Sequence, residues 1–188
     1  MAMSKLADNP YKTTLQGIAR RYGIRPVGAS HPHMELATIF LLSATDRYLE
    51  DGARWSCVMP GSLLSGLNHE PLRSEKYRSS DAALPLQFDA IWELPQNIFK
   101  NKAIVLSGKK SDLPSLDVLA GRVYTEAGVY TEAYYTLNRQ GNRSAWTNRG
   151  RDVEVADILG GDALKFSQGC DLFPRTALFH EFVERPNG

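Results

Sequence analysis

The sequence contains few cysteines and has almost no net charge. Its two cysteines, Cys57 and Cys170, are too few for the disulfide framework that holds many small secreted domains together. The 22 Lys and Arg against 21 Asp and Glu leave a net charge of +1, which predicts no general affinity for nucleic acids or membranes. Any basic surface must therefore be local. The low cysteine content fits a cytoplasmic location, which is expected.

Long apolar runs are also lacking. The chain holds no run of about 18 apolar residues, so no transmembrane helix is expected. Residues 1–8 lack the apolar centre of a signal peptide. The hydrophobic share of 43% is nevertheless enough to form a core, and 188 residues suit one domain or one domain with an appendage.

Common catalytic and phosphate-binding patterns are missing as well. Neither the dinucleotide pattern GxGxxG nor the phosphate-loop pattern GxxxxGK[ST] occurs. Residues 61–66 have the wrong spacing for the hydrolase pattern GxSxG, and no histidine or acid can be assigned to Ser62. His31 and His33 could ligate a metal, but no third ligand lies nearby and a solvent loop is favoured. We predict no metal site and interpret the isolated His69 as structural.

A helix, a tight turn and a strand form the clearest pattern that is present. Residues 35–49 have apolar side chains at helical spacing, and Asp51-Gly52 ends the helix. Residues 54–59 form an apolar strand with little alternation, as in a sheet that is covered on both faces. Pro60 opens a loop at the carboxyl end of this strand, where open α/β sheets bind ligands. The helix is expected to bury a wide stripe: Leu36, Ile39, Phe40, Leu41, Leu42, Ala44, Tyr48 and Leu49.

Two further apolar runs extend the expected sheet. Residues 88–94 and 103–107 predict strands, and the connection between them is too short for a helical crossover, so the two should be antiparallel. Shorter helices are expected at residues 13–22, where Gly23 would end the helix, and at residues 70–78.

The sequence after Ser111 leans toward β-structure. Residues 116–122 could form a helical turn. Residues 123–127 and 129–133 are both Val-Tyr-Thr-Glu-Ala and are separated by Gly128. A strand with a glycine kink, or a chance duplication, explains them better than a repeat fold, because two copies do not make a solenoid.

The chain therefore divides into three regions. A lead-in covers residues 1–33, an α/β region covers residues 34–110, and an extension covers residues 111–188. Within the extension, a short helix is expected at residues 153–159 and a last strand at residues 176–183.

Arginines gather around one tryptophan in a polar stretch at residues 138–151. Arginines contact phosphates and a tryptophan can stack on a base, so the stretch predicts contact with DNA. A solvated loop with a buried tryptophan explains the stretch equally well. The candidate DNA-binding residues are Arg139, Arg143, Trp146, Arg149 and Arg151.

Residues 34–64 resemble a part of the adenine-N6 DNA methyltransferases, the S-adenosylmethionine-dependent enzymes of restriction–modification and phage-defence systems. In that family a helix ending in Leu leads to a Gly-Gly turn, an apolar strand ending in Pro and a Ser-Leu-Leu-like loop. Here Gly52-Ala53 stands in place of Gly-Gly, and the loop is Ser62-Leu63-Leu64. Residues 88–110 resemble the closing hairpin of the family, with Leu94-Pro95, Ile98-Phe99 and a strand that ends in Lys109-Lys110.

The resemblance also suggests candidate site residues. The catalytic motif of the family is Asn/Asp-Pro-Pro-Tyr/Phe, which holds a flipped adenine. Its nearest match is Asp8-Asn9-Pro10-Tyr11, with Asn where the first Pro belongs. A turn or helix start also explains this segment, since Asn-Pro commonly begins turns, and the true motif could lie upstream of this chain. The loop at Pro60, Gly61 and Ser62 would border the target-base pocket.

The fold implied by the resemblance is α/β, a partial class I (Rossmann-like) methyltransferase sheet with a β-rich carboxyl-terminal extension. No cofactor-binding βα unit with a Gly-x-Gly turn precedes Met34. The implied function is a fragment of a DNA methyltransferase that is inactive alone, with S-adenosylmethionine bound only in the intact family. DNA, and either a second copy or a missing amino-terminal half, are the expected partners. The alternative is a non-catalytic DNA- or protein-binding module with a truncated methyltransferase fold.

Overall fold

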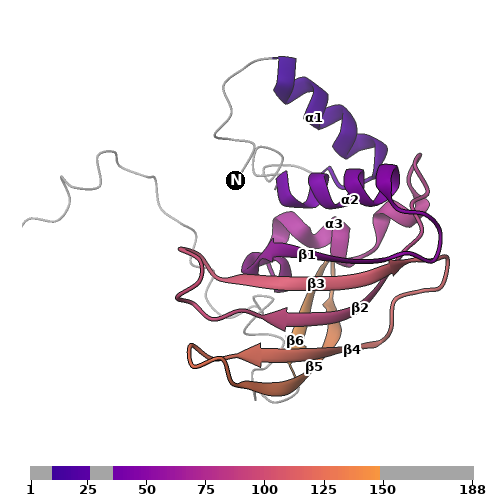
Figure 1. The fold of residues 1–188 in the computed structure, drawn as a ribbon. Coiled ribbons are helices and arrows are strands. Elements are labelled where there is room, and N and C mark those ends of the chain that lie inside the picture. The colour runs from indigo at the N-terminus through magenta and orange to yellow at the C-terminus, as the bar shows by residue number, and fades with distance from the viewer. Residues whose placement is uncertain (1–9, 26–35, 149–188) are drawn as a thin grey trace, which may run out of the picture.

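The computed structural model describes residues 10–25 and 36–148, which form a mixed α/β fold with one six-stranded sheet and few helices (Figure 1). None of the helices within these residues has the length and apolar character needed to span a membrane. The helices are α1 (Pro10–Arg21), α2 (Leu36–Tyr48) and α3 (Glu70–Arg73), with short 3-10 segments η3 (Gly61–Leu64), η4 (Leu67–His69) and η5 (Lys76–Ser79). The strands are β1 (Arg54–Pro60), β2 (Leu86–Glu93), β3 (Ala103–Lys110), β4 (Val118–Tyr124), β5 (Tyr130–Gln140) and β6 (Arg143–Asn148).

The strands follow the order β1-β3-β2-β4-β5-β6 across the sheet. Neighbouring strands are antiparallel except β2 and β4, which are parallel. The predicted antiparallel pairing of residues 88–94 with residues 103–107 is therefore confirmed as β2 and β3. Strands β4 to β6 extend the same sheet, so the described part of region 111–188 shares a core with the region before it.

The helix, turn and strand are found as predicted, but the buried side of the helix differs. Gly52 lies in the turn after α2 with φ 82°, a conformation that suits glycine. Phe40 and Tyr48 are 68% and 81% exposed, so the predicted stripe is too wide. At 100° per residue Phe40 turns away from the side that packs, whereas Tyr48 lies near the direction of the buried Leu41 but is the last residue of the helix. The buried residues of α2 are Thr38, Ile39, Leu41, Leu42 and Thr45.

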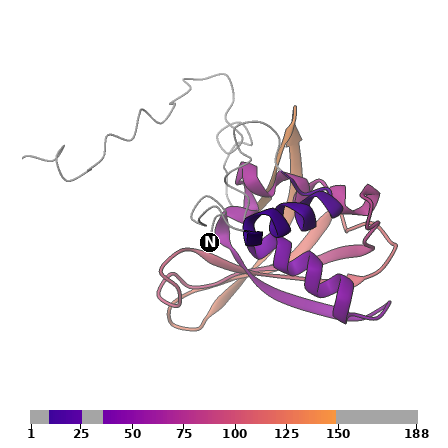
Figure 2. The same cartoon turned by 90° about the horizontal axis from the view of Figure 1, so that it is seen from above.

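Strand β1 alternates between buried and exposed residues, which corrects the expectation of a sheet covered on both faces. Trp55 and Met59 are buried, whereas Val58 is 52% exposed. Helix α2 packs against β1, and α1 packs against α2. The two views show α1 and α2 side by side, with α2 next to β1 (Figures 1 and 2). The sheet face that carries Val58 is open to solvent at this strand.

Aromatic side chains form the centre of the core. The ring of Phe88 makes edge contacts with Trp55, Tyr77 and Trp146, at centroid distances of 5.9, 5.9 and 5.7 Å. Such contacts contribute about 0.5–1.5 kcal/mol each beyond area burial. Because Trp55 lies in β1 and Trp146 in β6, Phe88 joins the first and last strands of the sheet.

Two predictions after Ser111 are wrong. Residues 116–122 do not form a helical turn, because β4 alternates buried Leu119 and Gly121 with exposed Ala120. A Cβ at Gly121 would lie 2.5 Å from the ring of Tyr135, so glycine allows this close packing. The described part of the stretch at residues 138–151 is not a loop, since β5 and β6 form a hairpin there.

The repeated Val-Tyr-Thr-Glu-Ala sequence forms a hairpin rather than a kinked strand. The first copy ends β4 and the second lies in β5. The Thr125 N–H donates to the Val129 carbonyl at 2.8 Å, and Gly128 has φ 77°. The expected helix at residues 153–159, the expected strand at residues 176–183, and Cys170 lie outside the described residues.

The shorter helices are confirmed in part. Helix α1 covers the expected helix at residues 13–22, and Gly23 follows it with φ 64°. The expected helix at residues 70–78 is divided into α3 and η5, because Glu75 takes the left-handed conformation with φ 55°.

Candidate functional site

The carboxyl ends of β1, β2 and β4 lie together at one end of the sheet. Pro60 is opposite Ala103 of β3, and Glu93 is opposite Ile104 of β3 and Val123 of β4. The arrowheads of β2 and β4 point to this end, on the left in Figure 1. We call it the Pro60 end. In open parallel α/β sheets, ligands bind at the carboxyl ends of the strands.

Ser62 lies in η3 at the Pro60 end and is tied to a buried histidine. The Oγ of Ser62 is 3.1 Å from Nε2 of His69, and Nδ1 of His69 is 2.9 Å from Oγ1 of Thr38. Ser62 is exposed, whereas His69 is only 1% exposed. The fold thus brings together two residues that appeared unrelated in the sequence, and it connects the loop after β1 to α2.

This Ser62–His69–Thr38 chain is poorly suited to nucleophilic catalysis. Burial, together with the charge of Arg73, lowers the pKa of His69 to about 4. An imidazole with this pKa is a weak base at neutral pH. Thr38 also offers only a neutral hydroxyl where a hydrolase places a carboxylate to stabilise the imidazolium. The contacts therefore position Ser62 and do not activate it.

Glu93 is a buried carboxylate at the end of β2. It is 4% exposed, the Tyr135 hydroxyl donates to its Oε1 at 2.6 Å, and Nζ of Lys102 lies 2.5 Å from its Oε2. Charge-assisted contacts of this kind offset the cost of removing a carboxylate from water. Glu93 and Lys102 line an open hollow of about 340 Å³ between the β2–β3 and β4–β5 connections, which Gln96, Tyr124 and Glu126 also line.

Lys102 joins this hollow to the loop after β1. The N–H of Gly61 donates to the Lys102 carbonyl at 2.7 Å, and a Cβ at Gly61 would lie 2.7 Å from Cγ of Lys102. Any larger residue at position 61 would therefore push the lysine away. The same residue supports the predicted pocket edge and neutralises Glu93, and its side chain is still 39% exposed. An ammonium has three donors, which allows Lys102 to contact Glu93 and a ligand together.

Arg73 holds the segments behind this loop. It is 1% exposed, and its guanidinium donates to the carbonyls of Leu63 and Gly66 at 2.9 Å each. It also pairs with Oε2 of Glu70 at 3.1 Å. The same Glu70 oxygen accepts hydrogen bonds from the N–H and the hydroxyl of Ser144, each at 2.7 Å. Arg73 therefore connects η3, α3 and β6.

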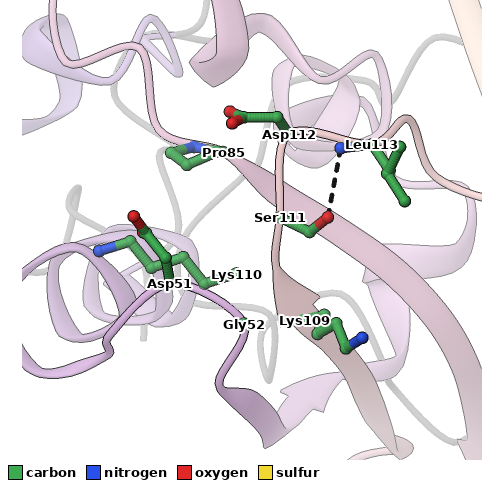
Figure 3. Close-up of a pocket in the computed structure, with 8 residues that line it drawn as sticks. All are labelled: Asp51, Gly52, Pro85, Lys109, Lys110, Ser111, Asp112 and Leu113. Carbon is green, nitrogen blue, oxygen red and sulfur yellow. Dashed lines mark hydrogen bonds between the residues drawn. The ribbon is translucent and has the colours of Figure 1, made fainter.

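A second hollow, of about 310 Å³, lies where β3 ends and β1 begins, and we call this the Lys110 end (Figure 3). The ammonium of Lys110 donates to the carbonyls of Leu49 at 2.8 Å and Asp46 at 3.5 Å. These carbonyls belong to the carboxyl-terminal part of α2 and the residue after it, which a cation stabilises. Figure 3 shows Lys109 pointing away from Lys110. The charge of Lys110 is therefore used by the fold.

The predicted catalytic segment is described only in part. Pro10 and Tyr11 begin α1, and Tyr11 is 57% exposed. Asp8 and Asn9 lie outside the described residues. A helix start is one of the two local interpretations that the Asn-Pro pair allows, and proline suits the first turn of a helix.

The predicted DNA-binding residues separate into three groups. Arg139 and Arg143 are exposed near the tip of the β5–β6 hairpin. Trp146 is only 5% exposed and packs on Phe88, so its ring is not available to stack on a base. Arg149 and Arg151 lie outside the described residues. The stretch therefore contains a buried tryptophan, although in a hairpin rather than a loop.

Sequence reasoning missed Glu93, Lys102, Tyr135 and Arg73. One signal was available, because a carboxylate inside the apolar run at residues 88–94 indicates a buried and partnered charge. Its partners Lys102 and Tyr135 lie in other strands or connections and become neighbours only through the register of the sheet.

The described residues contain neither a metal-ligand cluster nor the glycine turn of the cofactor site that the resemblance implies. Within residues 10–25 and 36–148, no group of three or more His, Cys, Asp or Glu could hold a metal ion. No Gly-x-Gly turn for S-adenosylmethionine occurs in these residues either. Comparison with protein-family models found no match, and neither did comparison with curated proteins.

Proposed function

We propose that the chain is the carboxyl-terminal half of an adenine-N6 DNA methyltransferase domain from a restriction–modification or phage-defence system. One observation carries the proposal. Helix α2 and strand β1 lead into the loop at Pro60, and the β2–β3 hairpin joins the same sheet with β3 beside β1. The resemblance expects these elements in this order. A partial class I, Rossmann-like sheet is the finer fold description that belongs to this proposal.

The chemistry of the Pro60 end supports a role at the edge of a target-base pocket. Ser62 is an exposed residue whose hydroxyl is held by the contact with His69. Lys102 presents a partly exposed ammonium next to Gly61. Oriented hydroxyl and ammonium donors are suited to hold phosphates or base edges, which positions DNA without reacting with it.

Methyl transfer is not expected from this chain alone. In the family that it resembles, S-adenosylmethionine supplies the methyl group from a separate βα unit. No Gly-x-Gly turn occurs within residues 10–25 and 36–148, which supports the assignment of the methyl donor to another segment. We therefore assign to this half the contact with DNA, and to another polypeptide segment the binding of the methyl donor.

The test measures cofactor binding and methyl transfer separately. Titration calorimetry with S-adenosylmethionine should show no binding to the chain alone, and radiolabelled methyl transfer to duplex DNA should be absent. Addition of the amino-terminal half of an adenine-N6 DNA methyltransferase should produce transfer that Lys102→Met reduces. Transfer by the chain alone would contradict the assignment of this chain as an inactive half.

A non-catalytic DNA-binding module is a second candidate, and one cluster favours it. The guanidinium of Arg122 lies 4.5 Å from the ring centroid of Tyr130 and 5.6 Å from that of Trp92. Tyr134 is 51% exposed and is opposite Ala120, two residues from Arg122 on the same face of β4. Exposed aromatic rings beside an arginine are typical of surfaces on which unpaired bases stack.

The two candidates predict different preferred forms of DNA and different binding surfaces on the chain. A binding module should be stabilised by single-stranded DNA, with a rise in Tm that falls steeply with salt and is lost in a Tyr134→Ala, Arg122→Met variant. The methyltransferase half should instead respond to duplex DNA through the Pro60 end. No change in Tm with either DNA would count against both.

A further inference from the structure

Strand β1 is an edge strand whose outer side has no strand partner among the described residues. Hydrogen bonds at its two ends show which residues face β3. Lys110 N–H donates to the Ala53 carbonyl at 2.9 Å, and Gly61 N–H donates to the Lys102 carbonyl at 2.7 Å. Backbone groups of an antiparallel strand point alternately to its two sides. The backbone groups of Arg54, Ser56, Val58 and Pro60 therefore face the outer side.

Helix α2 lies next to β1 (Figure 1), but the strand itself has no bulge and no internal proline or lysine that would prevent strand addition. Its register with β3 is continuous from Arg54 to Pro60, with no bulge. Natural edge strands are commonly protected by bulges, by prolines within the strand or by lysines. The proline of β1 is its last residue, so the N–H groups of Arg54, Ser56 and Val58 remain as outward donors.

We propose that β1 of a second copy of this chain pairs with this edge in antiparallel fashion, with Ser56 on the two-fold axis. In this register Ser56 is opposite Ser56 of the second copy, and Arg54 is opposite Val58 of the second copy. These are the outward-facing residues, so each pair can exchange two backbone hydrogen bonds. The edge is thus complementary to itself, as a two-fold interface requires.

Charge also favours this arrangement. The same register places Asp51 opposite Gly61 of the second copy, and Gly61 packs against Lys102. Glu50 and Asp51 are both exposed, so an acidic end of each strand meets a lysine-bearing end of its partner. On the open face, Arg54 would lie beside Val58 of the second copy, which covers a valine that is 52% exposed.

The dimer does not rest on the methyltransferase proposal, and its test measures a different quantity. A strand from a cofactor-binding half is the other occupant of this edge, and in that case the isolated chain would be a monomer. A monomeric wild-type chain in light scattering and sedimentation would therefore overturn the proposal, whatever the outcome of methyl-transfer assays.

The first experiment compares the full chain with two variants at the axis. Wild type should have twice the monomer mass. Ser56→Pro removes an outward N–H and leaves the hydrogen bonds between β1 and β3 in place, so it should give the monomer mass with an unchanged circular dichroism spectrum. Ser56→Ala keeps the N–H but loses the 3.0 Å contact with Ser107, and it should remain a dimer.

A cross-linking experiment tests the register even where Ser56→Pro fails to fold. In a background with Cys57→Ser and Cys170→Ser, Ser56→Cys should form an intermolecular disulfide on oxidation. Residues opposite each other in a hydrogen-bonded pair have Cα atoms about 5.5 Å apart, which suits a disulfide. Val58→Cys is the matched control, since its two copies would be displaced by about 13 Å along the strands. Equal cross-linking of the two variants would overturn the proposed register.

Discussion

The two ends of the sheet carry hollows of similar volume, about 340 Å³ at the Pro60 end and about 310 Å³ at the Lys110 end. Both contain lysines and carboxylates, but the charged groups have different partners. At the Lys110 end, the ammonium of Lys110 donates to main-chain carbonyls at the end of α2. At the Pro60 end, Lys102 and Glu93 contact each other beside the hollow.

This difference separates a structural charge from one that is available for binding. A lysine on the last carbonyls of a helix completes the fold, because those carbonyls have no partner within the helix. A pair of side chains that lines a hollow can instead share its donors and acceptors with a ligand. We therefore expect substitutions at the Lys110 end to change stability, and substitutions of Lys102 to change binding.

The largest effect is expected where the Pro60 end is attached to the rest of the fold. Arg73→Ala should lower the free energy of unfolding by about 3–5 kcal/mol, because it removes a buried guanidinium, leaves the part-buried carboxylate of Glu70 without its cation and leaves two carbonyls without their donor. Urea denaturation measures the change. Arg20→Ala, on the exposed side of α1, is the control and should change stability by less than about 0.5 kcal/mol. A loss below about 1 kcal/mol for Arg73→Ala would show that the buried contacts do not support the loops.

The second prediction concerns pH. The pKa of His69 is about 4 in the folded protein and 6.5 in the unfolded chain, so between these values the unfolded chain binds more protons. Stability should be fully present above pH 6.5 and should decline as the pH falls toward 4, by on the order of 3 kcal/mol in total. Denaturation at several pH values measures the decline.

His69→Gln is the matched control for this pH dependence. Glutamine retains one donor and one acceptor for Ser62 and Thr38 but does not titrate in this range. The variant should therefore show a smaller decline between pH 6.5 and 4 than wild type. An identical decline in both proteins would assign the pH dependence to other groups.

The parts of the fold that the sequence predicted are those with local causes. The turn at Gly52 and the strands around residues 88–94 and 103–107 follow from turn chemistry and short apolar runs, and the structure contains them. The buried side of α2 was predicted wrongly because the local pattern allows more than one side. Phe40 and Tyr48 fit a helical stripe as well as Leu42 does, and only packing decides which side is buried.

The parts that could not be predicted depend on contacts between distant segments. Glu93 meets Tyr135 because β5 lies beyond β4 in the sheet, and Arg73 meets Ser144 because the last hairpin returns to α3. Ser62 and His69 are close in sequence, yet their contact depends on two consecutive 3-10 segments that no local pattern indicated. The sequence therefore predicted the loop of the candidate site but not its charged residues.

A smaller effect should distinguish the two lysines of the Lys110 end. Lys110→Met should cost about 1–2 kcal/mol of unfolding free energy, since it removes a charge-assisted contact with the end of α2. Lys109→Met should change stability by less than about 0.5 kcal/mol, because the Lys109 side chain points away from this contact. Thermal or urea denaturation measures both variants. Equal losses would mean that the cap on α2 does not stabilise the fold.

The last prediction concerns Lys102→Met, which should change DNA binding as well as stability. Lys102→Met leaves the 4% exposed carboxylate of Glu93 without its cation, but Glu93 keeps the Tyr135 hydroxyl and the Lys102 side chain is 39% exposed, so the loss should be about 1–2 kcal/mol. Its affinity for duplex DNA should fall, and the slope of log affinity against log salt should decrease by about 1 if the ammonium contacts a phosphate. Fluorescence anisotropy measures both quantities. An unchanged slope would remove Lys102 from the DNA contact.

The most direct test of the account asks where DNA binds. A titration of the isotope-labelled chain with a short duplex that contains an unpaired adenine can be followed by amide chemical shifts in NMR spectra. If DNA binds at the Pro60 end, the largest shifts occur at Gly61, Ser62 and Lys102, with little change at Gly52 and Lys110. Shifts confined to the Lys110 end, or to Arg139 and Arg143 at the tip of the last hairpin, would contradict binding at the Pro60 end.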